Sequence, residues 1–84
     1  MEYREIWGVS AERISEYFSA RPCALEDGPL RFRLGETSVI LTRLPDNTVT
    51  GFAMPRTEVL ISGPRESTEA VYRGFFMRFL SAGG

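Results

Sequence analysis

The sequence predicts an α+β domain, a two-layer sandwich of a four-stranded antiparallel meander and two helices in the order α-β-β-β-β-α. An apolar stripe with helical spacing lies within residues 10–22, and a second one lies within residues 64–80. Between them, residues 30–62 contain four short runs with strand character. Because both helices must bury their stripes against the sheet, we expect them on one of its faces. A chain of 84 residues is expected to form one domain, residues 1–84.

The first helix is expected to begin after Ser10, whose hydroxyl can accept a hydrogen bond from the first turn. Ile14 and Phe18 then share one stripe, because residues four apart lie on the same face of a helix. Pro22 ends the helix, since the residue before a proline is disfavoured in the α conformation. The segment before this helix, residues 1–7, is left open as a strand, a helical turn or coil.

Four strand-like runs follow the first helix, and turn residues fill the gaps between them. The runs are residues 30–34, 37–44, 49–54 and 57–62. We expect two-residue turns at Gly35-Glu36 and Pro55-Arg56, and a four-residue loop at 45–48. In a meander these turns fix which residues face one another across the sheet.

The turn lengths predict a register for each pair of neighbouring strands. The first turn places Phe32 opposite Val39, the loop places Leu41 opposite Phe52, and the last turn places Phe52 opposite Val59. All three registers bring the same apolar set to the face that the helices cover. This set is Leu30, Phe32, Leu34, Val39, Leu41, Phe52, Met54, Val59 and Ile61.

The second helix is expected to begin with Pro64 at its first position and to run to about Leu80. Phe75 and Phe79 lie at the centre of its apolar stripe, which is wide enough to cover the inner face of the sheet. Phe76 and Leu80 extend the stripe to its rim, where the helix meets solvent.

The opposite face of the predicted sheet is more apolar than a solvated face needs to be. Arginines lie on one edge strand, but aliphatic side chains cluster in or near the middle, and their clustering predicts an interaction surface. The alternative is that single exposed aliphatic side chains on a sheet need no explanation. The candidate interaction residues, including two on the helix rim, are Ile40, Leu44, Val49, Ala53, Leu60, Phe76 and Leu80. The candidate anion contacts are Arg31 and Arg33.

The composition offers little for catalysis. There is no histidine, and Cys23 is the only cysteine, so neither a hydroxyl nor the thiol has the usual general base beside it. No run of residues has the spacing of a metal site. We therefore expect no catalytic residue, no metal and no cofactor, and we expect that the protein is not an enzyme.

Charge and hydropathy limit the partners. The basic residues, all arginine, are scattered among eleven acidic ones, and the net charge is −1, so nucleic acid is not expected as a partner. No apolar run approaches the ~20 residues that span a bilayer, and no secretory signal precedes the first helix. A lone cysteine favours a reducing compartment, so we expect a cytoplasmic protein.

The sequence therefore predicts a non-enzymatic protein-interaction module. It is expected to form a homodimer or to dock an unidentified protein through the open sheet face or the C-terminal helix rim. One alternative is a nucleic-acid-binding domain that uses its arginines. The other is a carrier of a small apolar ligand held between the helices and the sheet, a space that bulky rings are expected to fill instead. These rings are Phe18, Phe32, Phe52, Phe75 and Phe79.

Overall fold

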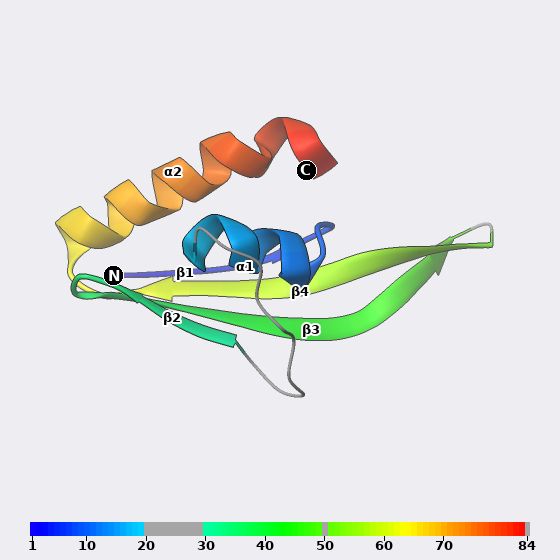
Figure 1. Cartoon of the computed structure of the whole chain (residues 1–84), viewed down its shortest axis with the longest axis horizontal. Helices are drawn as coiled ribbons and strands as arrows, with labels where there is room; N and C mark the ends of the chain where they lie inside the picture. Colours follow the sequence, from blue (N-terminus) through cyan, green and yellow to red (C-terminus); the bar gives the residue numbers. More distant parts are fainter. Residues whose placement is uncertain (20–29, 50, 84) are drawn as a thin grey trace.

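Four antiparallel strands form an open sheet, and two helices lie on one of its faces (Figure 1). The computed structural model describes residues 1–19, 30–49 and 51–83. Its elements are β1 (Glu2–Trp7), α1 (Ala11–Ser19), β2 (Leu30–Leu34), β3 (Thr37–Val49), β4 (Phe52–Ser62) and α2 (Arg65–Gly83). The strand order is β1-β4-β3-β2, and every neighbouring pair is antiparallel. The α+β class, the antiparallel sheet of four strands and the placement of both helices on one face are thus confirmed.

The segment that the sequence left open is a strand. β1 pairs with β4 along its whole length, from Glu2 opposite Ser62 to Trp7 opposite Thr57. The pairing continues past the strand end, because the amino group of Met1 donates to the carbonyl of Gly63 at 2.8 Å. β1 therefore supplies the fourth strand of the sheet, at the edge next to β4.

Three strands follow α1, where the sequence predicted four. The predicted runs at 49–54 and 57–62 fall mostly within one strand, β4. The register of β2 with β3 is as predicted, with Phe32 opposite Val39. The predicted loop at 45–48 and the predicted turn at Pro55-Arg56 are wrong, since β3 and β4 continue through both and lie opposite each other as a long hairpin. Leu41 consequently faces Val59, not Phe52.

The reversal falls instead between β3 and β4, where Gly51 has a φ of +86°, a conformation that glycine adopts at no steric cost. Both prolines are tolerated within the hairpin because they lie at one irregularity. The register shifts between Leu44 and Asn47, where Pro45 and Asp46 of β3 stand against the single residue Pro55 of β4. A bulge interrupts the hydrogen-bond ladder there, so the missing N–H groups of the prolines break no regular pairing.

The first helix begins after Ser10 as predicted, and α2 begins at Arg65, one residue after the predicted first position at Pro64. The N–H of Arg13 donates to the Ser10 hydroxyl at 3.3 Å, and Pro64 precedes α2 and accepts from Thr68 N–H at 2.9 Å. α2 extends to Gly83, three residues past the expected end. The predicted end of the first helix at Pro22, and Cys23, lie outside the described residues.

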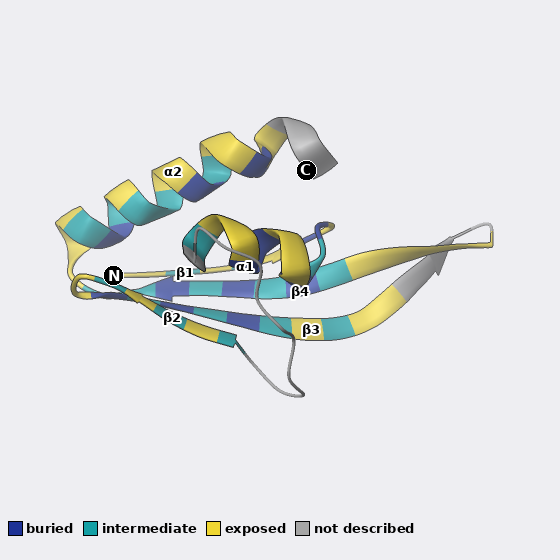
Figure 2. Cartoon of the chain, in the orientation of Figure 1, coloured by how far each residue is buried: buried dark blue, intermediate teal, exposed yellow. Residues whose placement is uncertain are grey.

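The core lies between the helices and the inner face of the sheet (Figure 2). Aromatic rings fill this space: Phe18 stacks on Phe32 and on Phe75, with ring centroids 6.0 and 5.8 Å apart, and Phe75 contacts Phe79 at 5.4 Å. Phe52 and Met54, predicted to join this core, do not, and their exposed fractions are 71% and 48%. The corrected register moves them away from the helices.

The hairpin extends well beyond the rest of the sheet. β2 begins opposite Leu41, and β1 stops opposite Thr57, so the far parts of β3 and β4 have no other strand beside them. We call residues 44–49 and 51–56 the arm and the remaining described residues the body. Figure 1 shows the arm projecting past both helices, and the molecule measures 42 × 25 × 19 Å. The arm is therefore a two-stranded ribbon that no helix covers.

Candidate interaction surfaces

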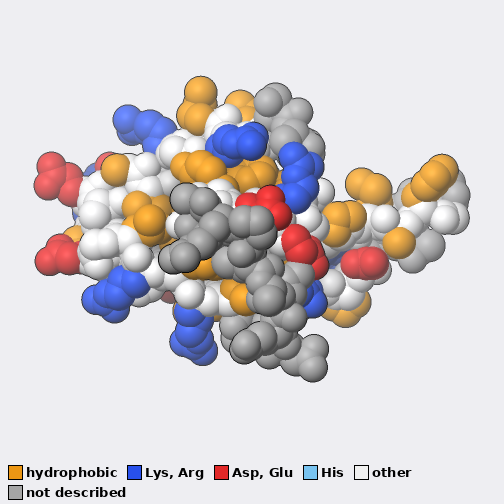
Figure 3. Space-filling model, in the orientation of Figure 1, with side chains coloured by type: hydrophobic (Ala, Val, Ile, Leu, Met, Phe, Trp, Pro, Cys, Tyr) orange, Lys and Arg blue, Asp and Glu red, His pale blue; other side chains and the backbone are white. Residues whose placement is uncertain are grey.

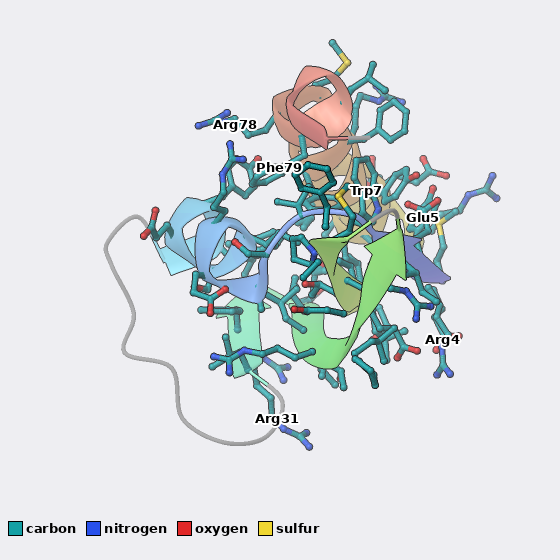
Figure 4. The ribbon with its side chains drawn as sticks, turned by 90° about the vertical axis from the view of Figure 1, so that its right-hand side faces the viewer. Arg4, Glu5, Trp7, Arg31, Arg78 and Phe79 are labelled. Carbon is teal, nitrogen blue, oxygen red and sulfur yellow. The ribbon has the colours of Figure 1, made fainter. Side chains whose placement is uncertain are left out.

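The face of the sheet opposite the helices is uncovered, and its centre is an aliphatic pair. Ile40 lies directly opposite Leu60, and both are half-buried. Arg31 lies beside Ile40 on β2, and Arg4 lies beside Leu60 on β1, so one row across the sheet reads arginine, isoleucine, leucine, arginine. Figure 4 shows Arg4 and Arg31 on the side of the sheet away from the helices, toward opposite edges. The sequence predicted this face for Ile40, Leu60 and Arg31, and the structure places them on it.

We use the name open face for the uncovered surface formed by Arg4, Arg31, Arg33, Ser38, Ile40, Thr42, Leu44, Arg56, Glu58 and Leu60. The arm exposes a separate set of apolar side chains. Phe52 and Met54 are 71% and 48% exposed. Figure 3 shows the hydrophobic side chains of the arm mainly on the side on which the helices lie.

The remaining interaction candidates on the sheet, Leu44, Ala53 and Val49, do not lie together at its centre. Leu44 is half-buried and lies on the open face opposite Arg56. Ala53 is exposed in the arm, beyond the part of the sheet that β1 and β2 flank. Val49 lies opposite Phe52 in the arm. The register error moved the whole segment, since a shift of one residue exchanges the two faces of a strand.

Two charges interrupt the apolar side chains of the open face on β4. Arg56 and Glu58 are both half-buried and lie between Met54 and Leu60. Within the described ranges, the ion pairs join Arg43 to Glu12 at 3.6 Å and Arg65 to Glu69 at 3.2 Å, and neither involves Arg56 or Glu58. β3 contributes no charge to this part of the face, where it presents Thr42 and Leu44. Neither side chain therefore forms an ion pair in the described part of the chain, and the two opposite charges lie two residues apart on the same side of β4.

A second surface is a groove between β1 and the C-terminal half of α2, which we call the rim groove. It is an open, mainly apolar hollow of about 520 Å³. Its lining residues are Glu5, Ile6, Trp7, Gly8, Phe76 and Leu80. Ile6 and Leu80 are 55% and 51% exposed. The sequence predicted Phe76 and Leu80 for the helix rim, but it missed the β1 residues because no strand was assigned to them.

The polar groups of the rim groove bind one another. The Tyr72 hydroxyl lies 2.9 Å from each carboxylate oxygen of Glu5 and donates to this group, and Trp7 Nε1 donates to Oε1 at 3.1 Å. The Tyr72 ring stacks on Tyr3 with centroids 3.9 Å apart. Burial raises the pKa of Tyr72 to about 12, and the hydrogen bond to Glu5 and its negative charge add to the effect. Tyr72 thus stays a proton donor at neutral pH, and the surface left for a partner is apolar.

Metal sites and membrane spans are two further kinds of feature that the described residues could contain. Among residues 1–19, 30–49 and 51–83, no cluster of three or more cysteine or acidic side chains could hold a metal ion. No helix in the part of the chain that the structure describes is long and apolar enough to cross a membrane. No family model matches the sequence, and no curated protein or solved structure is significantly similar to it. The open face and the rim groove are the surfaces on which a function can be argued.

Proposed function

We propose that the protein is a non-enzymatic protein-interaction module that self-associates through its open face. The observation that carries the proposal is the aliphatic pair of Ile40 and Leu60 at the centre of a sheet face that no helix covers. Monomeric proteins rarely expose contiguous apolar patches larger than a few hundred Å² unless the patch is functional. Here the apolar side chains of the open face run from Ile40 and Leu60 at the centre of the sheet to Leu44 at the base of the arm, and Arg56 and Glu58 interrupt them on β4.

The arm adds a second reason. An isolated two-stranded ribbon is only marginally stable in water, and the arm has neither a third strand nor a helix beside it. Burying a side chain the size of phenylalanine or methionine contributes about 1.5–3 kcal/mol. A partner that covers Phe52 and Met54 would therefore stabilise the arm as well as the complex. An interaction surface explains why such side chains stand on an otherwise weak element.

The rim groove is the competing surface for the same function. It is apolar, and Leu80 lies at its edge with about half of its surface exposed. The groove is short, however, and its lining comes from one strand and two residues of α2. The open face offers a longer apolar surface, so we assign self-association to the open face.

Sedimentation velocity over micromolar to near-millimolar concentrations tests the proposal. The wild type is expected to change from monomer to dimer as its concentration rises. Leu60→Glu should stay monomeric, because it places a charge at the centre of the open face. Leu80→Glu, the matched substitution on the rim groove, should dimerise like the wild type. A wild type that stays monomeric throughout would refute self-association, and loss of the dimer in Leu80→Glu alone would move it to the rim groove.

A further inference from the structure

We infer that the outer edge of β1 binds an extended segment of another protein, which adds to the sheet as a further strand and places an apolar side chain in the rim groove. The added segment runs antiparallel to β1, with an acidic residue opposite Arg4 and a basic residue opposite Glu2. This surface differs from the open face, and the inference does not depend on self-association.

The backbone of β1 carries a regular set of groups that no strand pairs. The amino group of Met1 donates to the Gly63 carbonyl at 2.8 Å, and the N–H of Gly63 donates to the Met1 carbonyl at 3.0 Å. In an antiparallel ladder, pairs that exchange both bonds alternate with pairs that exchange none. The register of β1 with β4 is unbroken, so this alternation continues along the strand. The residues whose N–H and C=O groups point away from β4 are therefore Glu2, Arg4 and Ile6.

No strand of the described chain lies beside these groups. β1 is the last strand in the order β1-β4-β3-β2, so one of its edges faces away from the sheet. The free groups recur every second residue, about 6.6 Å apart, and an extended backbone has the same repeat. An edge of this kind is a template for a further strand, and strand addition is an established mode of peptide recognition. The free backbone groups thus specify the conformation of the occupant.

The side of β1 toward α2 has room for the side chains of an added strand. The rim groove lies beside Trp7, and a second hollow of about 350 Å³ lies beside Tyr3. Phe76 lines both, so the two hollows adjoin along the seam between β1 and α2. Figure 4 shows Glu5 and Trp7 on the side of β1 toward α2 and Arg4 on the other side. Because side chains alternate, residues opposite Trp7 and Tyr3 in an added strand both point toward these hollows.

The exposed charges of β1 determine the charge order of the occupant. Glu2 and Arg4 are both exposed, and neither belongs to an ion pair in the described ranges. Opposite charges directly across two strands attract, and like charges there are destabilising. The rim groove is mainly apolar, with Leu80 half-exposed at its edge. From its N-terminus, an antiparallel segment therefore carries a large aliphatic residue opposite Trp7, an acid opposite Arg4 and a base opposite Glu2.

A second copy of β1 does not have this order. The free groups of one copy must face those of the other, so a two-fold axis places one residue of the strand opposite itself. The registers centred on Arg4 and on Glu5 pair residues 2–6 and 3–7, and each places a charge opposite the same charge. Registers centred on Tyr3 or Ile6 avoid this clash, but they pair only residues 2–4 or 5–7. The occupant is therefore a segment of a different protein.

A short fluorescein-labelled peptide tests the inference by fluorescence anisotropy. The probe Ser-Leu-Ile-Thr-Glu-Thr-Lys-Ser places leucine opposite Trp7, glutamate opposite Arg4 and lysine opposite Glu2. Exchanging its glutamate and lysine should weaken binding by about fivefold to tenfold, because both charge pairs become repulsive. N-methylation of the glutamate amide, which faces β1, should weaken binding by at least about tenfold. N-methylation of the threonine before it, whose amide faces away from β1, should change binding by less than about threefold.

Substitutions in the protein complete the test. Leu80→Glu should weaken binding of the probe by at least about tenfold, because it places a charge at the rim groove. The double variant Glu2→Arg and Arg4→Glu should reverse the preference and bind the charge-exchanged peptide more tightly than the probe. Ile40→Glu is the matched control, since it charges the centre of the open face and should bind the probe like the wild type. Circular dichroism melting checks that each variant is folded.

Each result has a definite meaning for the edge of β1. Binding that ignores the charge order or the position of the N-methyl group would overturn the inference, and so would the absence of binding at about 1 mM protein. Loss of binding in Ile40→Glu but not in Leu80→Glu would place the peptide on the open face instead. A wild type that stays monomeric in sedimentation would refute the proposed self-association alone, because peptide binding needs only one copy of the chain.

Discussion

β4 runs through both the body and the arm, and the exposure of its apolar side chains differs between the two regions. In the body it lies between β1 and β3 under the helices, and Val59 and Ile61 are 2% and 0% exposed. In the arm β1 has ended and no helix overlies the strand, and Phe52 and Met54 are largely exposed. The two halves of one strand are thus equally apolar but differ in what covers them.

The comparison teaches that burial along this strand depends on its neighbours. Phe52 is larger and more apolar than Val59, but only Val59 has β1, β3 and the helices around it. Apolar side chains in the body therefore stabilise the fold. Apolar side chains in the arm are available to a partner, and their removal should cost the monomer little.

Two phenylalanines give the largest expected difference between body and arm. Phe75 is completely buried, with Trp7, Phe18 and Phe79 around its ring, whereas Phe52 is 71% exposed. Phe75→Ala should lower the free energy of unfolding by about 3–5 kcal/mol, because it leaves a cavity in the core. Phe52→Ala should change it by no more than about 0.5 kcal/mol. Urea unfolding below the dimerisation range measures both, and an equal loss in the two variants would show that the arm packs as the body does.

Two threonines on opposite faces of the sheet allow a second comparison of unfolding free energies, with a smaller expected difference. The buried Thr57 hydroxyl donates to the carbonyl of Val9 at 2.7 Å and so ties the start of α1 to β4. Thr57→Val leaves this carbonyl without its partner and should cost about 1–3 kcal/mol. Thr42→Val on the open face should stay within about 0.5 kcal/mol of the wild type. A loss in Thr42→Val as large as that in Thr57→Val would mean that the open face of the monomer is covered.

The sequence predicted the body better than the arm, for a physical reason. Where a turn has a strong local signal, as at Gly35, the register of Phe32 with Val39 is right. The prolines at 45 and 55 were interpreted as turns, because a proline normally ends a strand. A bulge that accommodates both of them at one irregularity is a property of two paired strands, and neither strand shows it alone. The uncovered sheet face was predicted at Ile40 and Leu60, but the exposure of Phe52 and Met54 follows only from the true register.

β1 was missed for a related reason. Tyr3, Glu5 and Trp7 face the helices while Arg4 and Ile6 face outward, so the polar Glu5 breaks the apolar pattern that marks a half-buried strand. Glu5 is tolerated on the inner side because two side chains donate hydrogen bonds to it. The sequence alone does not show that Tyr72 and Trp7 donate hydrogen bonds to Glu5. Only the α2 side of the rim groove, Phe76 and Leu80, could therefore be predicted.

The smallest expected effect concerns the hydrogen bonds that Tyr72 and Trp7 donate to Glu5, all three of which lie in the body. The pKa of Tyr72 in the folded protein is about 12, above its ordinary value of 10.0. The folded state therefore holds a proton that the unfolded chain loses, and the stability contributed by Tyr72 is complete below pH 10 and is lost as the pH rises toward 12. The free energy of unfolding of the wild type should fall across this interval. The fall should be shallower in Tyr72→Phe, which keeps the stacking on Tyr3 but has no proton to lose. The arm has no tyrosine, so deleting the Phe52 side chain should leave the slope unchanged, and a slope that stays the same in Tyr72→Phe would show that this hydroxyl does not control alkaline stability.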